Sequence, residues 1–168
     1  MADLLTHVLV GFVIAVVLSW RFAWITPPFI AVAMVGAAIP DLNRMQLLVH
    51  ESSIEAMLGV PWSWSVFHRA GGALLVVMIL TVLVRREYMV PVSTMLLIGV
   101  SSHFLLDYGL WQASGRTSLM LWPITDAYLD VGGFYRSSDR WPMILALVAS
   151  VLVIVVDHRV MTEDVGAD

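Results

Sequence analysis

Residues 89–111 read MVPVSTMLLIGVSSHFLLDYGLW, an apolar run that is long enough to cross a lipid bilayer as a helix. The run also contains His103 and Asp107, which a helix places one turn apart on the same face. Ionisable side chains inside a membrane-spanning helix are costly to bury and are usually functional. This stretch therefore predicts both a spanning helix and a polar site within it.

The composition of the whole chain also indicates a membrane protein. Of the 168 residues, 60% are hydrophobic and 13% are charged, and the mean hydropathy is +0.86. A soluble domain is about half apolar and about a quarter charged, so an ordinary cytosolic enzyme and a disordered chain are both excluded. The length predicts one domain, which we place at residues 1–158, followed by a short acidic tail at 159–168.

Charge and cysteine content exclude further classes of protein. The formal net charge is −4 and no basic tract is present, so the sequence predicts no binding to nucleic acid. The chain has no cysteine, which excludes disulfide bonds, an iron–sulfur cluster, a thiolate zinc site and a cysteine nucleophile. Membrane lipid is the expected partner.

Four more apolar runs complete an expected all-α integral membrane bundle with about five transmembrane helices. A spanning helix needs about 20 mostly apolar residues, and the run at 70–84 reaches a workable length only if its helix begins near Val66. The acidic Asp3 favours a retained first helix over a cleaved signal peptide, which starts with positive charge. The four runs cover residues 4–20, 23–39, 70–84 and 141–156.

Two long connections are expected to lie on one side of the membrane. Residues 45–57, in the first of them, have the mixed apolar and polar pattern of a short amphipathic helix at the interface. The second, 112–140, is rich in Gly, Ser and Asp and is expected to cover one face.

The arginines predict a multi-pass protein of the cell membrane with its N-terminus outside. The positive-inside rule counts basic residues close to the membrane, and they are densest in the short connections and at the C-terminal end. The long connections, and the polar site near them, are then extracytoplasmic. The arginines on the cytoplasmic side are Arg21, Arg85, Arg86 and Arg159.

Histidine and carboxylate side chains gather at one membrane level, at the end that carries the long connections. Charges scattered by chance would not converge in this way. Imidazole nitrogen and carboxylate oxygen are the ligands of zinc and similar ions when thiolates are absent. They suffice for one complete site, or for two sites that share a carboxylate. The candidate metal ligands are His7, Asp41, His68, His103 and Asp107.

Each of these residues also has a purely structural interpretation. His7 and His68 fit side chains that face lipid headgroups, and Asp41 fits a residue that ends a helix. His103 and Asp107 fit a pair that satisfies itself without a metal. The joint placement, and not any single residue, favours a metal site.

The favoured function is that of an integral membrane, metal-dependent hydrolase. Zinc is the expected ion and manganese is the alternative. Metal coordination lowers the pKa of water and makes it a nucleophile. Asp41 or Asp107 would act as the general base, and Arg69 would orient an anionic group. A site at headgroup depth indicates a lipid or lipid-linked phosphoester as the substrate.

A non-enzymatic membrane protein is the alternative. It would use the same cluster for ion binding or transport, or would keep it as a structural feature. A transport path should continue polar residues toward the other membrane face. The run at 89–111 offers only small hydroxyl side chains there, which favours the enzyme. They are Ser93, Thr94, Ser101 and Ser102.

At these residues the sequence resembles the YdjM-like family, whose members are regarded as membrane-bound, metal-dependent hydrolases. The resemblance rests on short motifs that follow one another in order along most of the chain. It implies a helical protein with several spans and a divalent-metal hydrolase activity, and it does not supply the substrate. The motifs are Thr6-His7 with Gly11, Ile39-Pro40-Asp41-Leu42-Asn43, His68-Arg69-Ala70-Gly71-Gly72, Ser102-His103-Phe104-Leu105-Leu106-Asp107 and Leu121-Trp122-Pro123-Ile124.

Two positions depart from the pattern of this family. Asn43 stands where the family commonly has a second acid, and Gly72-Ala73 replaces a Thr-His pair. An asparagine carbonyl still binds a metal weakly, whereas an alanine side chain does not. We therefore expect about one divalent ion per chain.

Overall fold

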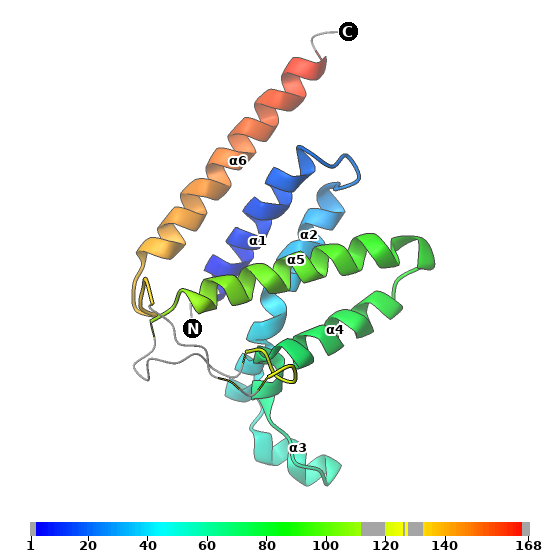
Figure 1. Cartoon of the computed structure of the whole chain (residues 1–168), viewed down its shortest axis with the longest axis vertical. Coiled ribbons are helices and arrows are strands. Elements are labelled where there is room, and N and C mark those ends of the chain that lie inside the picture. The colour runs from blue at the N-terminus through cyan, green and yellow to red at the C-terminus, as the bar shows by residue number, and fades with distance from the viewer. Residues whose placement is uncertain (1–2, 112–119, 126, 128–132, 166–168) are drawn as a thin grey trace.

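Helices make up all the regular structure that the computed structural model describes, at residues 3–111, 120–125, 127 and 133–165 (Figure 1). Within these ranges an isolated bridge joins Leu110 and Tyr135, and no longer strand forms. The expected all-α class is therefore confirmed for this part of the chain. The α-helices are α1 (Leu4–Ser19), α2 (Pro27–Ala38), α3 (Glu51–Leu58), α4 (Ala70–Val82), α5 (Met89–Tyr108) and α6 (Trp141–Val165), and the 3₁₀ helices are η1 (Ile39–Leu47), η2 (Trp64–His68) and η3 (Arg86–Tyr88).

Two helical segments of the described chain are long and apolar enough to cross a membrane. They are Arg86–Tyr108, which joins η3 to α5, and Trp141–His158 within α6. The helices α1 and α4 are apolar but shorter, so helix length does not confirm the expected five spans. The α6 helix continues to Val165, which makes the first part of the expected tail helical.

Proline and local geometry shorten two of the expected spans. The run at 23–39 becomes helical only at Pro27, because proline is favoured in the first turn of a helix and residues before it stay extended. The run near Val66 begins as the 3₁₀ helix η2, and the extended backbone of Arg69 separates it from α4. Both helices are therefore shorter than their apolar runs.

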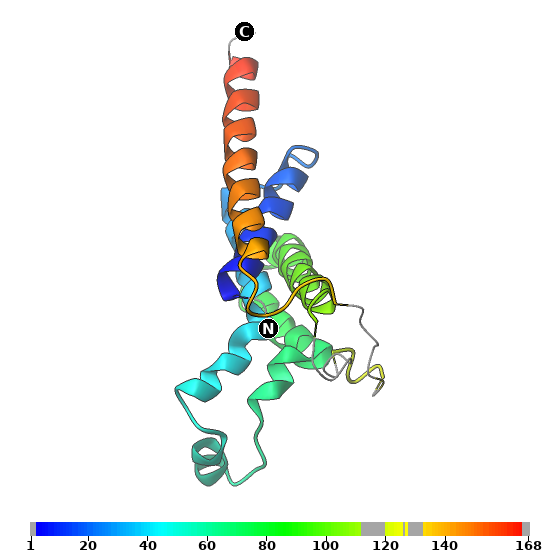
Figure 2. The same cartoon turned by 90° about the vertical axis from the view of Figure 1, so that its left-hand side faces the viewer.

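Small residues bring α2 and α5 into backbone contact at the centre of the molecule. A Cβ atom on Gly99 would collide with the backbone of Ala33 and Ala37, and a Cβ on Gly36 would collide with the backbone of Leu96. Small residues allow such close approach between helices in membranes. The helices α4 and α5 lie side by side and cross α6 steeply (Figures 1 and 2).

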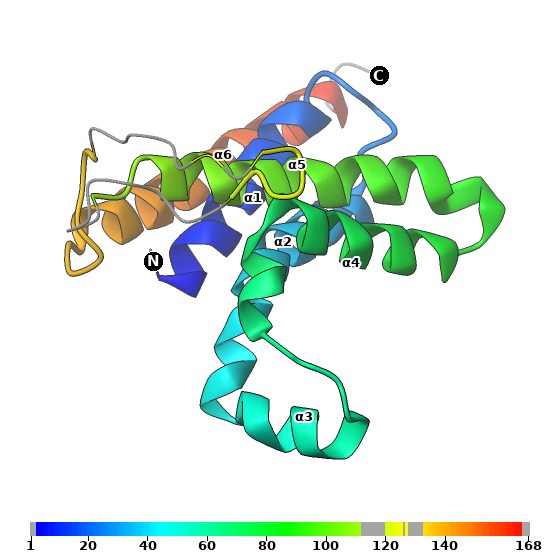
Figure 3. The ribbon, with the colours of Figure 1, turned by 60° about the horizontal axis from the view of Figure 1, so that its bottom comes forward.

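The prediction of one continuous amphipathic helix at 45–57 is wrong. The structure divides it into the end of η1 and the separate helix α3, because His50 has an extended backbone and caps α3. The Glu51 carboxylate accepts hydrogen bonds from the Trp64 backbone N–H at 2.9 Å and from the Ser63 hydroxyl at 3.1 Å. Helix α3 has no buried residue and projects away from the other helices (Figure 3).

The described parts of the second long connection close one end of the bundle. The carbonyl groups of Met120 and Trp122 accept hydrogen bonds from the N–H groups of Ala70 and Gly71, at 2.6 and 2.8 Å. Backbone N–H groups in the first turn of a helix have no partner within that helix, and these two bonds satisfy such groups in α4. The expected cover over one face applies to these residues, whereas 112–119, 126 and 128–132 lie outside the described ranges.

Candidate metal centre

Five buried side chains from four separate elements meet at one place in the fold. Helix α1 supplies His7, η1 supplies Asp41, the end of η2 supplies His68, and α5 supplies both His103 and Asp107. Their exposed fractions are 0% for His7 and His103, 2% for Asp107, 5% for Asp41 and 8% for His68. The fold thus brings together every candidate ligand that the sequence suggested.

Backbone carbonyl groups orient two of the three imidazole rings. The Nδ1 atom of His103 lies 2.7 Å from the Ala37 carbonyl oxygen, and the Nδ1 atom of His68 lies 3.3 Å from the Pro40 carbonyl oxygen. A carbonyl oxygen can only accept a hydrogen bond, so Nδ1 carries the hydrogen in the neutral ring and Nε2 presents a lone pair. Metal-binding histidines are commonly oriented in this way.

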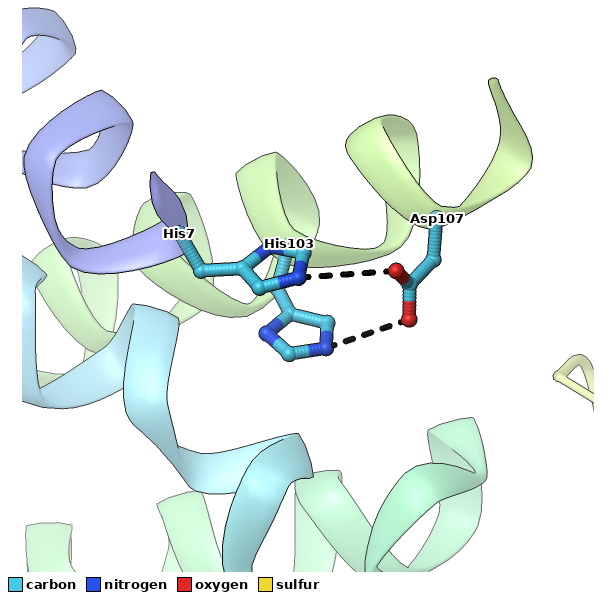
Figure 4. A group of neighbouring side chains, drawn as sticks. All are labelled: His7, His103 and Asp107. Atoms are coloured by element: carbon cyan, nitrogen blue, oxygen red, sulfur yellow. Dashed lines mark ion pairs between the residues drawn. The ribbon is translucent and has the colours of Figure 1, made fainter. Parts of the chain in front are cut away.

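The three Nε2 atoms surround the carboxylate of Asp107. The Nε2 atom of His68 lies 2.9 Å from Asp107 Oδ2, and that of His103 lies 3.4 Å from the same oxygen. The Nε2 atom of His7 lies 3.4 Å from Asp107 Oδ1. Figure 4 shows His7 and His103 pointing at the carboxylate from two helices.

Several of these buried atoms have no hydrogen bond from the part of the chain that the structure describes. They are Nδ1 and Nε2 of His7, Nε2 of His103, Oδ1 of Asp107 and both carboxylate oxygens of Asp41. A buried polar atom without a hydrogen bond costs roughly 1–3 kcal/mol. A cluster of such atoms therefore calls for an explanation.

The charges of the cluster are compatible with a divalent cation. In neutral rings the lone pairs of His68 and His103 face the negative oxygens of Asp107, which is repulsive. If His7 and His103 were protonated instead, two cationic rings would stack at 3.7 Å between centroids, with 13° between planes, away from water. A metal ion placed among the donors removes both conflicts.

The potential ligand atoms form two groups that share a residue. Two groups of potential ligand atoms lie within 4.8 Å of one another: His7 with His103 and Asp107, and Asp41 with His68 and His103. Both groups use His103, and its Nδ1 is already bonded to the Ala37 carbonyl. An ion in either group would therefore bind His103 through its remaining nitrogen, Nε2.

Asp41 has a cationic partner that sequence reasoning missed. The Nε atom of Arg44 lies 3.0 Å from Asp41 Oδ1. The signal was present in the sequence, because the two residues are spaced i, i+3 on one helical turn. Asp41 therefore has its negative charge balanced on the outer side of the cluster.

Arg69 lies apart from the carboxylates of the cluster. Its guanidinium group stacks over the Trp122 ring at 5.8 Å and donates to the Ser65 hydroxyl at 3.4 Å. Among the described residues it forms no ion pair with a carboxylate. Its expected role in orienting an anion stays a prediction.

Tyr135 is a second residue near the cluster that the sequence did not indicate. Its hydroxyl donates to the Leu106 carbonyl at 2.8 Å, one residue before Asp107. Burial raises the pKa of Tyr135 to about 12, and the negative charge of Asp107 adds to this effect. Because Tyr135 lies in an irregular connection, no helical periodicity predicts its position.

The two departures from the family pattern have different surroundings. Asn43 is half-buried in η1, close in sequence to Asp41. Ala73 is fully buried in the hydrophobic core with Ile39 and Leu96. The position of Ala73 therefore contributes to apolar packing and supplies no ligand to the cluster.

Comparison with known proteins identifies the family. The model of the family described as YdjM inner membrane protein matches residues 1–164, which is most of the chain. No curated protein and no solved structure matches the chain. With its apolar helices and its buried histidine and aspartate cluster, the chain belongs to the YdjM inner membrane protein family.

Proposed function

We propose that this protein is an integral membrane, metal-dependent hydrolase whose reaction centre is the buried His/Asp cluster. The observation that carries the proposal is the convergence of three imidazole Nε2 atoms on Asp107, with donor atoms left without hydrogen bonds. Histidine nitrogen with carboxylate oxygen is a common ligand set of hydrolytic zinc sites. Zinc is therefore the proposed ion, and manganese is the alternative.

The residues of the cluster divide into ligands and a base. His7, His68, His103 and Asp107 would hold the ion, because the Nε2 atom of each histidine lies within 3.4 Å of an Asp107 oxygen. When bound, a divalent ion activates water by lowering its pKa toward neutrality. Asp41 would accept the proton at Oδ2, because Oδ1 pairs with Arg44 and Oδ2 has no hydrogen bond from the described residues.

A lipid or lipid-linked phosphoester is the proposed substrate. The cluster lies in the second half of α5, near the end of a segment long enough to span the membrane. A lipid reaches such a level by lateral diffusion, with its ester group at headgroup depth. Hydrolysis of a phosphomonoester consumes one water molecule and releases inorganic phosphate and an alcohol.

The hydroxyl groups along the helices favour an enzyme over a transporter. Ser93 and Ser102 donate to carbonyl groups of α5 at 3.0 and 2.7 Å, and Thr81 donates to a carbonyl of α4 at 2.7 Å. Each of these hydroxyls is already engaged by its own helix. Within the described residues they provide no continuous polar path from the cluster to the opposite end.

Hydrolysis by the purified protein tests the proposed function. With zinc or manganese in mild detergent, we expect release of inorganic phosphate from phosphatidic acid in mixed micelles, and loss of release after chelation. Asp41→Asn should keep the metal and lower the rate about 100-fold or more, the typical contribution of a general base. A protein that binds metal but hydrolyses neither this lipid nor a soluble phosphomonoester would support the non-enzymatic alternative.

We also propose a multi-pass topology with the C-terminus in the cytoplasm and the cluster on the extracytoplasmic side. The carboxyl ends of α1 and α6 lie at the same end of the molecule (Figure 1), where Trp20 Nε1 donates to Asp157 Oδ1 at 3.0 Å. Arg21 follows α1 at this end, and the positive-inside rule places basic residues close to the membrane in the cytoplasm. A reporter that is active only in the cytoplasm should be active when it is fused after residue 168. If only a reporter that needs the extracytoplasmic side were active there, the proposed orientation would be wrong.

A further inference from the structure

A polar cavity of about 460 Å³ lies beside the cluster, between the start of α1, η1 and the segment that leads into α6. Figures 1 and 2 show the start of α1 next to this segment. Two serines and three arginines contribute to its wall: Ser137, Ser138, Arg44, Arg136 and Arg140. None of these five residues has a role in the reaction proposed above.

The cavity adjoins two residues of the cluster through its own wall. Thr6, which lines it, directly precedes His7 and is 2% exposed. Arg44, which also lines it, pairs with Asp41 at 3.0 Å. The cavity wall is therefore connected to the proposed metal site through Thr6 and through the pair of Arg44 with Asp41.

The segment that carries Arg136 contacts Trp111 outside the cavity and Asp139 within the cavity wall. The Arg136 guanidinium stacks over the Trp111 ring at 5.2 Å, and the Arg136 backbone N–H donates to Asp139 Oδ2 at 2.8 Å. The wall carries Arg44, which pairs with Asp41, and also Arg136 and Arg140 with the acidic Asp3 and Asp139. Guanidinium forks and serine hydroxyls are the donors that recognise phosphate oxygens.

We propose that this cavity binds a phosphate group of the substrate, and that Arg136 and Arg140 are its main anchors. The inference rests on the proposed hydrolase function and restricts it to substrates that carry a terminal phosphate, excluding neutral carboxylic esters. The shared chemistry is a phosphate group, either on a lipid headgroup or on a soluble molecule. Arg44 joins the cavity to the cluster and so links binding to the reaction.

Binding of inorganic phosphate, measured by calorimetry on the detergent-purified protein, tests the pocket independently of hydrolysis. Arg136→Gln and Arg140→Gln should each weaken phosphate binding about tenfold or more, as expected for a charge-assisted hydrogen bond. Metal content should stay unchanged in both variants. Arg85→Gln is the matched control, because Arg85 is 79% exposed and pairs with Glu87 outside the cavity, so it should bind as the original protein does.

These measurements distinguish phosphate binding in the cavity from hydrolysis at the His/Asp cluster. Phosphate binding should persist in part after chelation, since the arginines do not need the ion. Phosphate binding without hydrolysis would contradict the proposed hydrolase function and would still support the phosphate pocket. Short-chain phosphatidic acid that competes more tightly than glycerol 3-phosphate would identify a lipid headgroup, and equal competition would identify a soluble phosphate. Unchanged phosphate binding in the Arg136→Gln, Arg140→Gln double variant would overturn the inference.

Discussion

Replacing Asp107 with asparagine is expected to weaken zinc binding by more than about 100-fold, because even partners of metal ligands contribute roughly 10–100-fold. Asparagine keeps the shape of the side chain but removes the negative charge on which three imidazoles converge. Hydrolysis should be lost together with the metal. Competition against a fluorescent chelator measures the affinity, and gel filtration in detergent checks that the variant is folded.

Asp157→Asn is the control for this substitution. It makes the same chemical change at the other end of the molecule, where Asp157 accepts a hydrogen bond from Trp20. An amide oxygen can also accept that bond, so zinc affinity should not change. If Asp107→Asn kept full zinc affinity and only lowered stability, the cluster would be a structural network and the metal site would be wrong.

Gly99→Ala is expected to destabilise the protein although alanine favours helices. The new methyl group would collide with the backbone of Ala33 and Ala37, and overpacking of this kind costs up to about 3 kcal/mol. The gain in helix propensity is about 1 kcal/mol, so a net loss of about 2 kcal/mol remains. Thermal unfolding in detergent measures it.

The same substitution should also weaken metal binding. His103 lies one turn after Gly99 and is oriented by the Ala37 carbonyl, so moving α2 away from α5 turns its ring. Ala31→Leu is the control, because it adds a larger group to α2 at an exposed position. Unchanged stability and zinc affinity in Gly99→Ala would show that contact between these helices does not position the cluster.

Hydropathy and helical periodicity predicted the helical class and all five members of the cluster. Ionisable residues are rare in apolar helices, so His7, His103 and Asp107 were conspicuous in the sequence. Asp41 and His68 followed from their positions at the ends of apolar runs. Whether they bind a metal stays a prediction, although the structure brings all five together.

Helix lengths and irregular segments were harder to predict from the same sequence. Apolar runs do not show where a 3₁₀ helix replaces an α-helix, as at η1 and η2. They also give no sign of Tyr135, which reaches Leu106 from a connection without periodicity. Arg69 was named because it adjoins His68, whereas the pairing of Arg44 with Asp41 across one turn was missed.

Elemental analysis combined with X-ray absorption on zinc-loaded protein tests the central claim most directly. We expect roughly one ion per chain that survives gel filtration, with nitrogen and oxygen neighbours at about 2.0–2.2 Å. Carbon and nitrogen atoms of histidine rings should appear in the outer coordination shells around the zinc ion, since three imidazoles face the site. A correctly folded chain that retains no ion after loading with zinc or manganese would contradict the account.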